Sequence, residues 1–390
     1  MKPWITLLVI LSSALSGEVE VIKIAGNLDP HTRSYFWPAK TQGGIYIDNK
    51  DIYIADGNRI YIQDRHTAQH TWTPMEMGGK DSFKIYSILK VNNTYYLNSI
   101  WGNGRFYLSV HDLSGRSVSG LKPKHGSPGR MFGLRDDKIL VSGNYRPLYA
   151  YMLDRYDTNS ALTEVDKKKF NDLFLRTRSF TVAVYTADLK LMDSLNVIHR
   201  NGVNGELFDR LWTTQAIDMD TSETLYLVDN DQGYVIEKYV RPYTVKVEMR
   251  IENALYKPIP DRLTHEIFSD LQQRGTIYSV VYGLYVKGDR ILTTFYEKPS
   301  GRDAPSPPYG YNVSTLSGEP LLSSSLPYPI IAEDDEDKVF FYVTRKGGWF
   351  KPNQEYLVGM TLGDISKGLA KREAIDREIN EYEIGHGVAP

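Results

Sequence analysis

The sequence lacks cysteine entirely, with none among its 390 residues. This absence excludes disulfides, thiolate zinc sites, cysteine nucleophiles and a lipid anchor on a cysteine behind a signal peptide. An excess of charge is lacking as well, because 46 basic and 48 acidic side chains give a formal net charge of −2. No global field attracts polyanions, so we expect no nucleic-acid partner.

Long hydrophobic runs are also missing after the first residues of the chain. Residues 5–15 form a short apolar run, with Lys2 before it and Ala14-Leu15-Ser16 at its end. A basic start, a short apolar stretch and a small-x-small site are typical of an export signal. We predict a signal peptide at residues 1–17 and a periplasmic or secreted mature chain without membrane insertion; an uncleaved anchor or a buried strand are the alternatives.

Familiar catalytic motifs are absent from the sequence: it contains no G-x-S-x-G, no P-loop and no H-E-x-x-H. His66 and His70 are four residues apart, which on a strand separates them by about 13 Å, so we expect both to be solvated and not to bind a metal. The acidic run EDDED at 333–337 predicts a solvated hairpin tip between two apolar strands.

Tyrosine is abundant instead, with 28 residues, and it suits half-buried strands. Short alternating runs with polar turns between them recur along the chain, as in GIYI, DIYIA and RIYIQD within 44–64. Asp56, Asn98 and Asp229 occupy similar places after the second run of their groups, 42 and 131 positions apart, which fits a repeat of about 44 residues. Six such groups can be distinguished, at 44–64, 83–113, 131–192, 213–252, 277–318 and 329–363.

A sheet of three or four strands cannot bury both of its faces alone, whereas sheets stacked around a closed ring can. We therefore predict an all-β fold, a six-bladed β-propeller over residues 18–363. The alternating stretch 19–24 is expected to close the ring by pairing with the late strand at 356–360. Apolar spacing near 3.6 predicts short helical insertions at 160–174 and 261–275, and a short helical tail at 364–390.

The stretch IYIADGNRI at 52–60 resembles an NHL-type propeller repeat, and LYLVD at 225–229 repeats its first half. The whole chain resembles the exported bacterial six-bladed β-propeller proteins of the NHL and TolB-like superfamily. This resemblance implies either a binding module or an enzyme, since the superfamily includes lactonases and a peptide-amidating lyase. The fold alone does not decide between these activities.

Aromatic, amide and basic residues near turns after inner or second strands form the candidate binding set. If these turns share one end of the ring, they create a concave mouth suited to a glycan, peptide or small anion. The alternative is that such residues only cover loop surface. The candidates are Arg59, Trp101, Arg130, Asn144, Tyr145 and Arg146.

The resemblance to lactonase-like propellers also implies a cation in the channel, held by Glu, Asn and Asp side chains of different blades. The candidates here are Asn98, Asn144 and Asp229, whose oxygen atoms suit calcium, although no first strand offers an obvious glutamate. The recurrent Asp after the second strand can instead fix its turn by accepting backbone N–H groups. We expect a non-enzymatic binder or scaffold for a protein, peptide or glycan; the alternative is a metal-assisted hydrolase or lyase.

Overall fold

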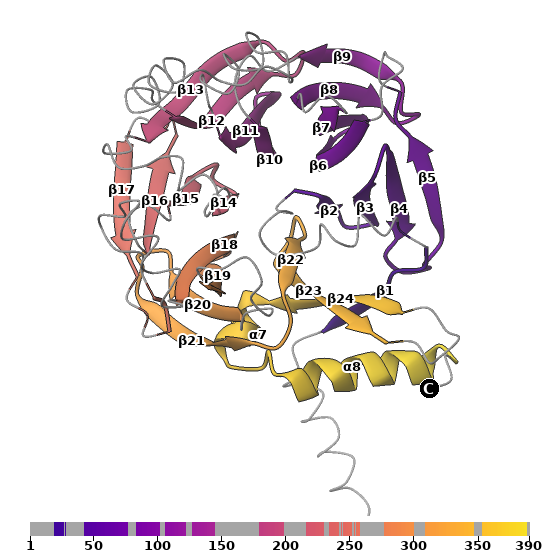
Figure 1. Cartoon of the computed structure of the whole chain (residues 1–390), viewed down its shortest axis with the longest axis vertical. Helices are drawn as coiled ribbons and strands as arrows, with labels where there is room; N and C mark the ends of the chain where they lie inside the picture. Colours follow the sequence, from indigo (N-terminus) through magenta and orange to yellow (C-terminus); the bar gives the residue numbers. More distant parts are fainter. Residues whose placement is uncertain are drawn as a thin grey trace, which may run out of the picture.

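The computed structural model describes residues 19–26, 28, 43–76, 83–101, 106–121, 127–144, 179–198, 216–229, 234–241, 243, 245–251, 253, 255–257, 277–299, 309–346 and 353–387. These residues form six four-stranded antiparallel sheets arranged as a ring (Figure 1). The chain is therefore a six-bladed β-propeller, which confirms the predicted fold. The predicted signal peptide and both predicted helical insertions lie outside the described residues.

Each blade starts with its strand nearest the channel, which we call the inner strand, and proceeds outward (Figure 1). Blade 1 consists of β2 (Ile45–Ile47), β3 (Asp51–Asp56), β4 (Arg59–Asp64) and β5 (His70–Pro74). Blade 2 consists of β6 (Phe83–Val91), β7 (Thr94–Trp101), β8 (Phe106–Asp112) and β9 (Ser117–Leu121). Blade 3 consists of β10 (Ser127–Gly133), β11 (Lys138–Asn144), β12 (Ser179–Thr186) and β13 (Leu191–Ile198).

The next two blades repeat this arrangement. Blade 4 consists of β14 (Ala216–Met219), β15 (Leu225–Asp229), β16 (Val235–Val240) and β17 (Val245–Arg250). Blade 5 consists of β18 (Ile277–Lys287), β19 (Arg290–Pro299), β20 (Tyr309–Thr315) and β21 (Pro320–Leu326).

Blade 6 joins the two ends of the chain. Its strands β22 (Ile330–Glu333), β23 (Lys338–Arg345) and β24 (Gln354–Thr361) are completed by β1 (Glu20–Lys23) as the outermost strand. β1 pairs antiparallel with β24, in a register that places Glu20 opposite Gly359 and Lys23 opposite Tyr356. The predicted closure of the ring by an N-terminal strand is thus confirmed.

The hydrophobic core lies between the blades. Strand β3 shows why, because its side chains alternate between the two neighbouring blades. Ile52 and Ile54 pack toward blade 6, whereas Tyr53 and Ala55 pack toward blade 2. Each of the six junctions between neighbouring blades contains one such buried cluster. The ring is therefore stabilised by contacts between blades as well as by the pairing of strands within each sheet.

Two helices follow the last strand and account for the predicted helical tail. α7 (Leu362–Ser366) is capped by Thr361, whose hydroxyl accepts the backbone N–H of Asp364. α8 (Arg372–Gly385) buries Ile375 and Ile379 in the cluster between blades 5 and 6. Figure 1 shows α8 along the outside of blade 6. In the part of the chain that the structure describes, no helix is long and apolar enough to cross a membrane.

Candidate ligand-binding site at the channel mouth

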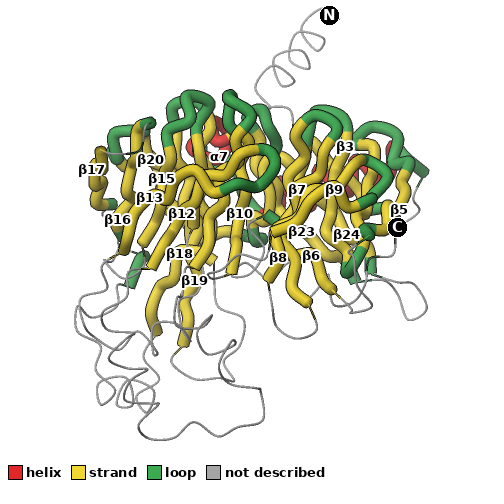
Figure 2. The backbone as a smooth tube through the Cα atoms, turned by 90° about the horizontal axis from the view of Figure 1, so that it is seen from above, coloured by secondary structure: helices red, strands yellow, loops and turns green. Residues whose placement is uncertain are grey.

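The six inner strands enclose the channel, and the turns that follow them surround one of its ends. A cavity of about 450 Å³ at this end is lined by residues from all six inner strands and the turns behind them. We call this cavity the cup. Figure 2, a side view of the ring, shows the described loops gathered mainly along one side.

The described lining of the cup combines charged side chains with apolar groups such as Ile45 and Phe132. The basic residues are Lys90, Arg130 and Lys287, and the acidic residues are Asp218, Asp220, Glu333, Asp334, Asp335 and Glu336.

Arg130 and Glu333 form an ion pair across the channel, which we call the crossbar. Arg130 comes from blade 3 and Glu333 from blade 6, which are opposite each other in a ring of six. The Arg130 guanidinium also donates to the backbone oxygen of Ile217 at 2.9 Å and lies 3.3 Å from Oδ1 of Asp218. The side chains of Arg130 and Glu333 are only 14% and 9% exposed. The crossbar is therefore largely shielded from water.

A β-bulge helps to aim Arg130 at this position. The pairing of β10 with β11 shifts register between Pro128 and Met131, the interval that contains Arg130. Bulges reorient side chains that regular alternation would direct elsewhere. The guanidinium additionally lies over the ring of Phe132, 4.7 Å from its centroid.

Lys287 links blade 5 to the crossbar. Its Nζ lies 2.9 Å from Oε2 of Glu333 and donates to the backbone oxygen of Asp334 at 2.5 Å. Burial lowers the pKa of Lys287. The negative charge of Asp218 opposes this shift, whereas the positive charge of Arg130 lowers the pKa further. Glu333 thus forms ion pairs with two cations from different blades.

Further contacts continue around the channel. Oδ2 of Asp218 in blade 4 accepts the backbone N–H of Val286 in blade 5 at 2.6 Å. The hydroxyl of Tyr46 in blade 1 donates to Asp335 in blade 6 at 2.8 Å. Lys90 in blade 2 lies 2.8 Å from Asp48 in blade 1. Polar contacts therefore connect the mouths of all six blades.

Asp335 differs from Glu333 and Asp334, because no cation of the described residues lies within ion-pair distance of its carboxylate. Partial burial raises the pKa of the Asp335 carboxyl, while the hydrogen bond from Tyr46 and the positive charge of Lys287 oppose this shift. Burial likewise raises the pKa of the Tyr46 hydroxyl. Asp335 remains exposed to water from the mouth.

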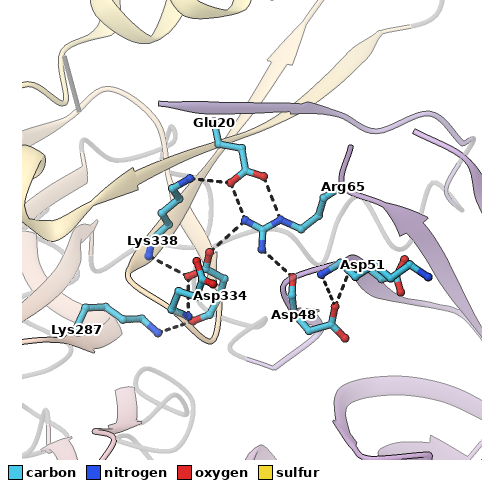
Figure 3. A network of polar contacts seen from close by, with 9 residues as sticks. Glu20, Asp48, Asp51, Arg65, Lys287, Asp334 and Lys338 are labelled. Atoms are coloured by element: carbon cyan, nitrogen blue, oxygen red, sulfur yellow. Dashed lines mark hydrogen bonds and ion pairs between the residues drawn. The ribbon is translucent and has the colours of Figure 1, made fainter. Parts of the chain in front are cut away.

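A second ionic cluster attaches the closing strand behind the cup (Figure 3). Arg65 donates to both carboxylate oxygens of Glu20, at 3.0 and 2.6 Å, and also contacts Asp334 at 3.2 Å. Lys338 lies 3.1 Å from Glu20. Burial by itself would raise the pKa of Glu20, but Arg65 and Lys338 hold it below its ordinary value. Asp334 thus belongs both to the cup lining and to the closure of the ring.

The structure does not bring the whole predicted binding set together. Arg130 lines the cup. Arg59 begins β4, while Trp101 and Asn144 end second strands. Because successive antiparallel strands reverse direction, these three positions belong to the opposite end of the ring. Tyr145 and Arg146 lie outside the described residues.

Arg59 has local partners in its own blade. It pairs with Asp56 at 2.8 Å and lies over the ring of Trp72, 5.1 Å from the centroid. Its role in binding, like that of Trp101, Asn144, Tyr145 and Arg146, stays a prediction.

Of the predicted metal ligands, only Asn98 has a described side chain, and it does not line the cup. Asn98 is fully buried within β7, three residues before its end, and so does not follow the second strand as the repeat spacing suggested. Asn144 and Asp229 end β11 and β15. Within the described part of the chain, no group of three His, Cys, Asp or Glu side chains is arranged to hold a metal ion. Calcium binding stays a prediction.

The acidic side of the cup was not predicted from the sequence. The expectation of a solvated hairpin tip at 333–337 is wrong for Glu333, whose side chain is 9% exposed, and for Asp334, which is 2% exposed. Glu333 also supplies the glutamate on an inner strand that was not expected from the sequence. The expectation that His66 and His70 are solvated is confirmed, since both are exposed.

A sequence signal for the mouth did exist in the aspartates that follow inner strands. Oδ1 of Asp48 accepts the N–H of Asp51, and Oδ1 of Asp220 accepts that of Thr224. Oδ1 of Asp334 accepts the N–H of Lys338 in the same way. Aspartates that fix turns by side-chain-to-backbone bonds thus mark the ends of three inner strands.

Comparisons with known proteins support the fold. No family model and no curated protein matches the chain. Among solved structures, a member of the DUF4221 family from Bacteroides vulgatus is similar over 89% of this chain and 98% of its own, with 10% identity and a TM-score of 0.53. The putative TolB from Agrobacterium tumefaciens matches over 79% and 87%, with 10% identity and a TM-score of 0.44. YjhT matches over 82% and 94%, with 9% identity and a TM-score of 0.45.

At 10% identity, the similarity to the DUF4221 protein shows a shared fold alone. Together with the six sheets described above, it places the chain in the class of six-bladed β-propellers. The particular ligand must be argued from the chemistry of the cup, since one propeller fold supports many functions.

Proposed function

We propose that this protein is a non-enzymatic binding or scaffolding propeller that acts outside the cytoplasm, in the periplasm or after secretion. It recognises a protein, peptide or carbohydrate through the cup and the turns around it. In this proposal it is a propeller of the NHL and TolB-like kind, as the repeat at 52–60 and the predicted signal peptide suggest.

The observation that carries this proposal is the cup itself. Its volume of about 450 Å³ is in the usual range of ligand sites, and every blade contributes to its wall. The crossbar and the contacts between neighbouring blades hold the lining in a fixed arrangement before a ligand arrives. A preorganised site loses less conformational entropy on binding, which favours recognition.

A crystallographic screen with chemically mixed fragments tests where ligands bind. We expect fragments to gather in the cup, in contact with residues such as Tyr46, Asp218 or Asp335. Fragments that gather only at the opposite end of the ring, or nowhere in the channel, would contradict the proposal.

Metal analysis distinguishes the binder from the metal-assisted hydrolase or lyase. The purified protein is analysed for bound elements, and its melting is recorded with and without a chelator. A binder should melt at the same temperature in both conditions. A stoichiometric metal whose removal lowers the melting temperature would favour the enzyme.

Export is tested by the N-terminus of the mature protein. If the signal peptide is cleaved as predicted, intact-mass analysis of protein recovered from the periplasm or the medium should show a chain beginning at Gly17 or Glu18. Protein that retains Met1 and stays with the cytoplasm would refute this part of the proposal.

A further inference from the structure

The charges around the cup are not equally available to a ligand. All three cations of the lining already have carboxylate partners: Lys90 pairs with Asp48, Arg130 with Asp218 and Glu333, and Lys287 with Glu333. Among the described residues, the lining nevertheless contains six acidic side chains against three basic ones. The unmatched charge in the cup is therefore negative.

Asp335 is the acidic group best placed to meet a ligand. It lines the cup, it is open to water, and the Tyr46 hydroxyl is its hydrogen-bond donor. Asp218 and Glu333 are occupied by cations, and Asp334 is occupied by Arg65. Asp220 accepts two backbone N–H groups of its turn and the hydroxyl of Tyr226. These partners leave Asp335 and Glu336 as the carboxylates of the described lining with room for a cation, and of these two Asp335 has its position set by the hydrogen bond from Tyr46.

We propose that the cup recognises a cationic group of its ligand, an ammonium or a guanidinium, which pairs with the Asp335 carboxylate beside the ring of Tyr46. This inference rests on the proposed function, because it specifies the chemistry of the same site. A lysine or arginine side chain of a peptide and an amino sugar both carry such a group.

An anionic ligand would meet a less favourable site. To reach a cation it must displace a carboxylate from Arg130, Lys287 or Lys90, and breaking a buried ion pair leaves an uncompensated charge. A cationic ligand needs no such displacement. The neighbouring acids Asp220 and Glu336 add long-range attraction, and the face of Tyr46 favours a cation further.

The test uses three small probes of equal carbon-chain length: cadaverine, pentanediol and glutarate. Each is titrated into the full-length mature protein at low salt, and binding is followed by saturation-transfer NMR. We expect cadaverine to bind at least tenfold more tightly than either of the other probes. Asp335→Asn should weaken cadaverine binding about tenfold, as expected for loss of a charged hydrogen-bond partner.

Asp337→Asn is the matched control, because Asp337 belongs to the same acidic run, is exposed and does not line the cup. It should leave cadaverine binding unchanged. Melting temperatures of both variants should match the wild type, since both replacements keep the shape of the side chain.

Three results would overturn the inference: no binding of cadaverine, equal or tighter binding of glutarate, or a cadaverine affinity that Asp335→Asn leaves unchanged. The fragment screen separates this outcome from failure of the proposed function. If neutral or anionic fragments occupy the cup, the binding function stands and only the charge preference is lost. If no fragment occupies the cup, both the proposed binding function and the preference for a cation are refuted.

Discussion

At the scale of single residues, Glu333 combines burial with two ionic partners. Its carboxylate faces Arg130 from the opposite blade and Lys287 from the adjacent one, and its side chain is 9% exposed. A buried ion pair is a poor source of net stability, because desolvation offsets the attraction. Removing one partner is costly, however, since the remaining charges stay buried without compensation.

Glu333→Gln should therefore destabilise the protein by about 3–5 kcal/mol, because it leaves Arg130 and Lys287 without their shared carboxylate. Urea unfolding of the variant measures this loss. The matched control is Glu336→Gln, which alters an exposed residue of the same turn and should change stability by less than about 0.5 kcal/mol.

The crossbar itself can be tested with a double-mutant cycle of Glu333→Gln and Arg130→Met. We expect the double variant to lose about 0.5–3 kcal/mol less than the two single losses combined, because the two side chains interact directly. Additive losses would show that Arg130 and Glu333 contribute independently to stability, which would contradict a direct interaction across the crossbar.

At the scale of elements, the closing strand β1 decides whether blade 6 is complete. Its residue Ile22 is 2% exposed and packs in the cluster between blades 6 and 1. Glu20 attaches the same strand to Arg65 of blade 1 and Lys338 of blade 6. The strand therefore joins the ring through apolar and ionic contacts together.

Ile22→Ala should cost about 2–5 kcal/mol, since it removes a buried side chain and leaves a cavity at the closure. Val118→Ala is the comparison, because Val118 is 67% exposed on the outer strand β9 and should cost far less. Thermal and urea unfolding measure both. Similar losses for the two variants would mean that the packing of β1 contributes little to the stability of the folded protein.

The ionic part of the closure predicts a dependence on pH. The folded pKa of Glu20 lies below its ordinary value of 4.5, so the ionised group contributes stability that is fully present above that value. This contribution is lost as the pH falls through the lower, folded pKa. Stability of the wild type should decline in this acid range, and Glu20→Gln should be less stable at neutral pH but decline less.

Urea midpoints recorded from about pH 7 to about pH 3 provide the test, with the wild type and Glu20→Gln compared at each pH. Arg65→Ala should flatten the profile in the same way, because it removes the principal partner of Glu20. Parallel profiles of wild type and Glu20→Gln would show that Glu20 is not linked to acid unfolding.

At the scale of the whole molecule, blade 6 is built from both ends of the chain, but the architecture does not dictate which blade combines them. Each outermost strand pairs with only one neighbour, as β1 does with β24 and β13 with β12. The turn between β12 and β13 has exposed residues at Ala187 and Asp188. Exposed turns of this kind tolerate new chain ends.

A circular permutant should therefore fold. It would begin at Asp188, join residue 387 to residue 19 through a glycine–serine linker, and end at Ala187, so that β13 closes blade 3 from the new N-terminus. We expect circular dichroism spectra like those of the wild type and a melting temperature within a few degrees. A chain that simply lacks residues 19–24 should melt much earlier, because blade 6 then exposes its buried strand β24.

Particular residues explain what the sequence could predict about the fold. Ile52 and Ile54 alternate with Tyr53 and Ala55 because each face of the strand packs on another blade, and this period of two is visible without a structure. The closing strand was predictable for the same reason. Outer strands such as β5 escaped notice because their side chains are mostly exposed and carry no alternating pattern.

The candidate site was far less predictable. Arg130 was anticipated as a binding residue, but its partners Asp218, Glu333 and Lys287 were not, although each lies at or near the end of an inner strand. They are 88 to 203 positions from Arg130 in the sequence. Register shifts, such as the one beside Arg130, also break the alternation from which a side chain's direction is inferred.

The sequence by itself determined the repeating hairpins, the number of blades and the strand that closes the ring, because these follow from local alternation and turn chemistry. Only the tertiary structure decided which charged groups meet in the channel. Closing a ring brings together the ends of six strands that are distant along the chain, and no local pattern records that Arg130 and Glu333 face each other across it.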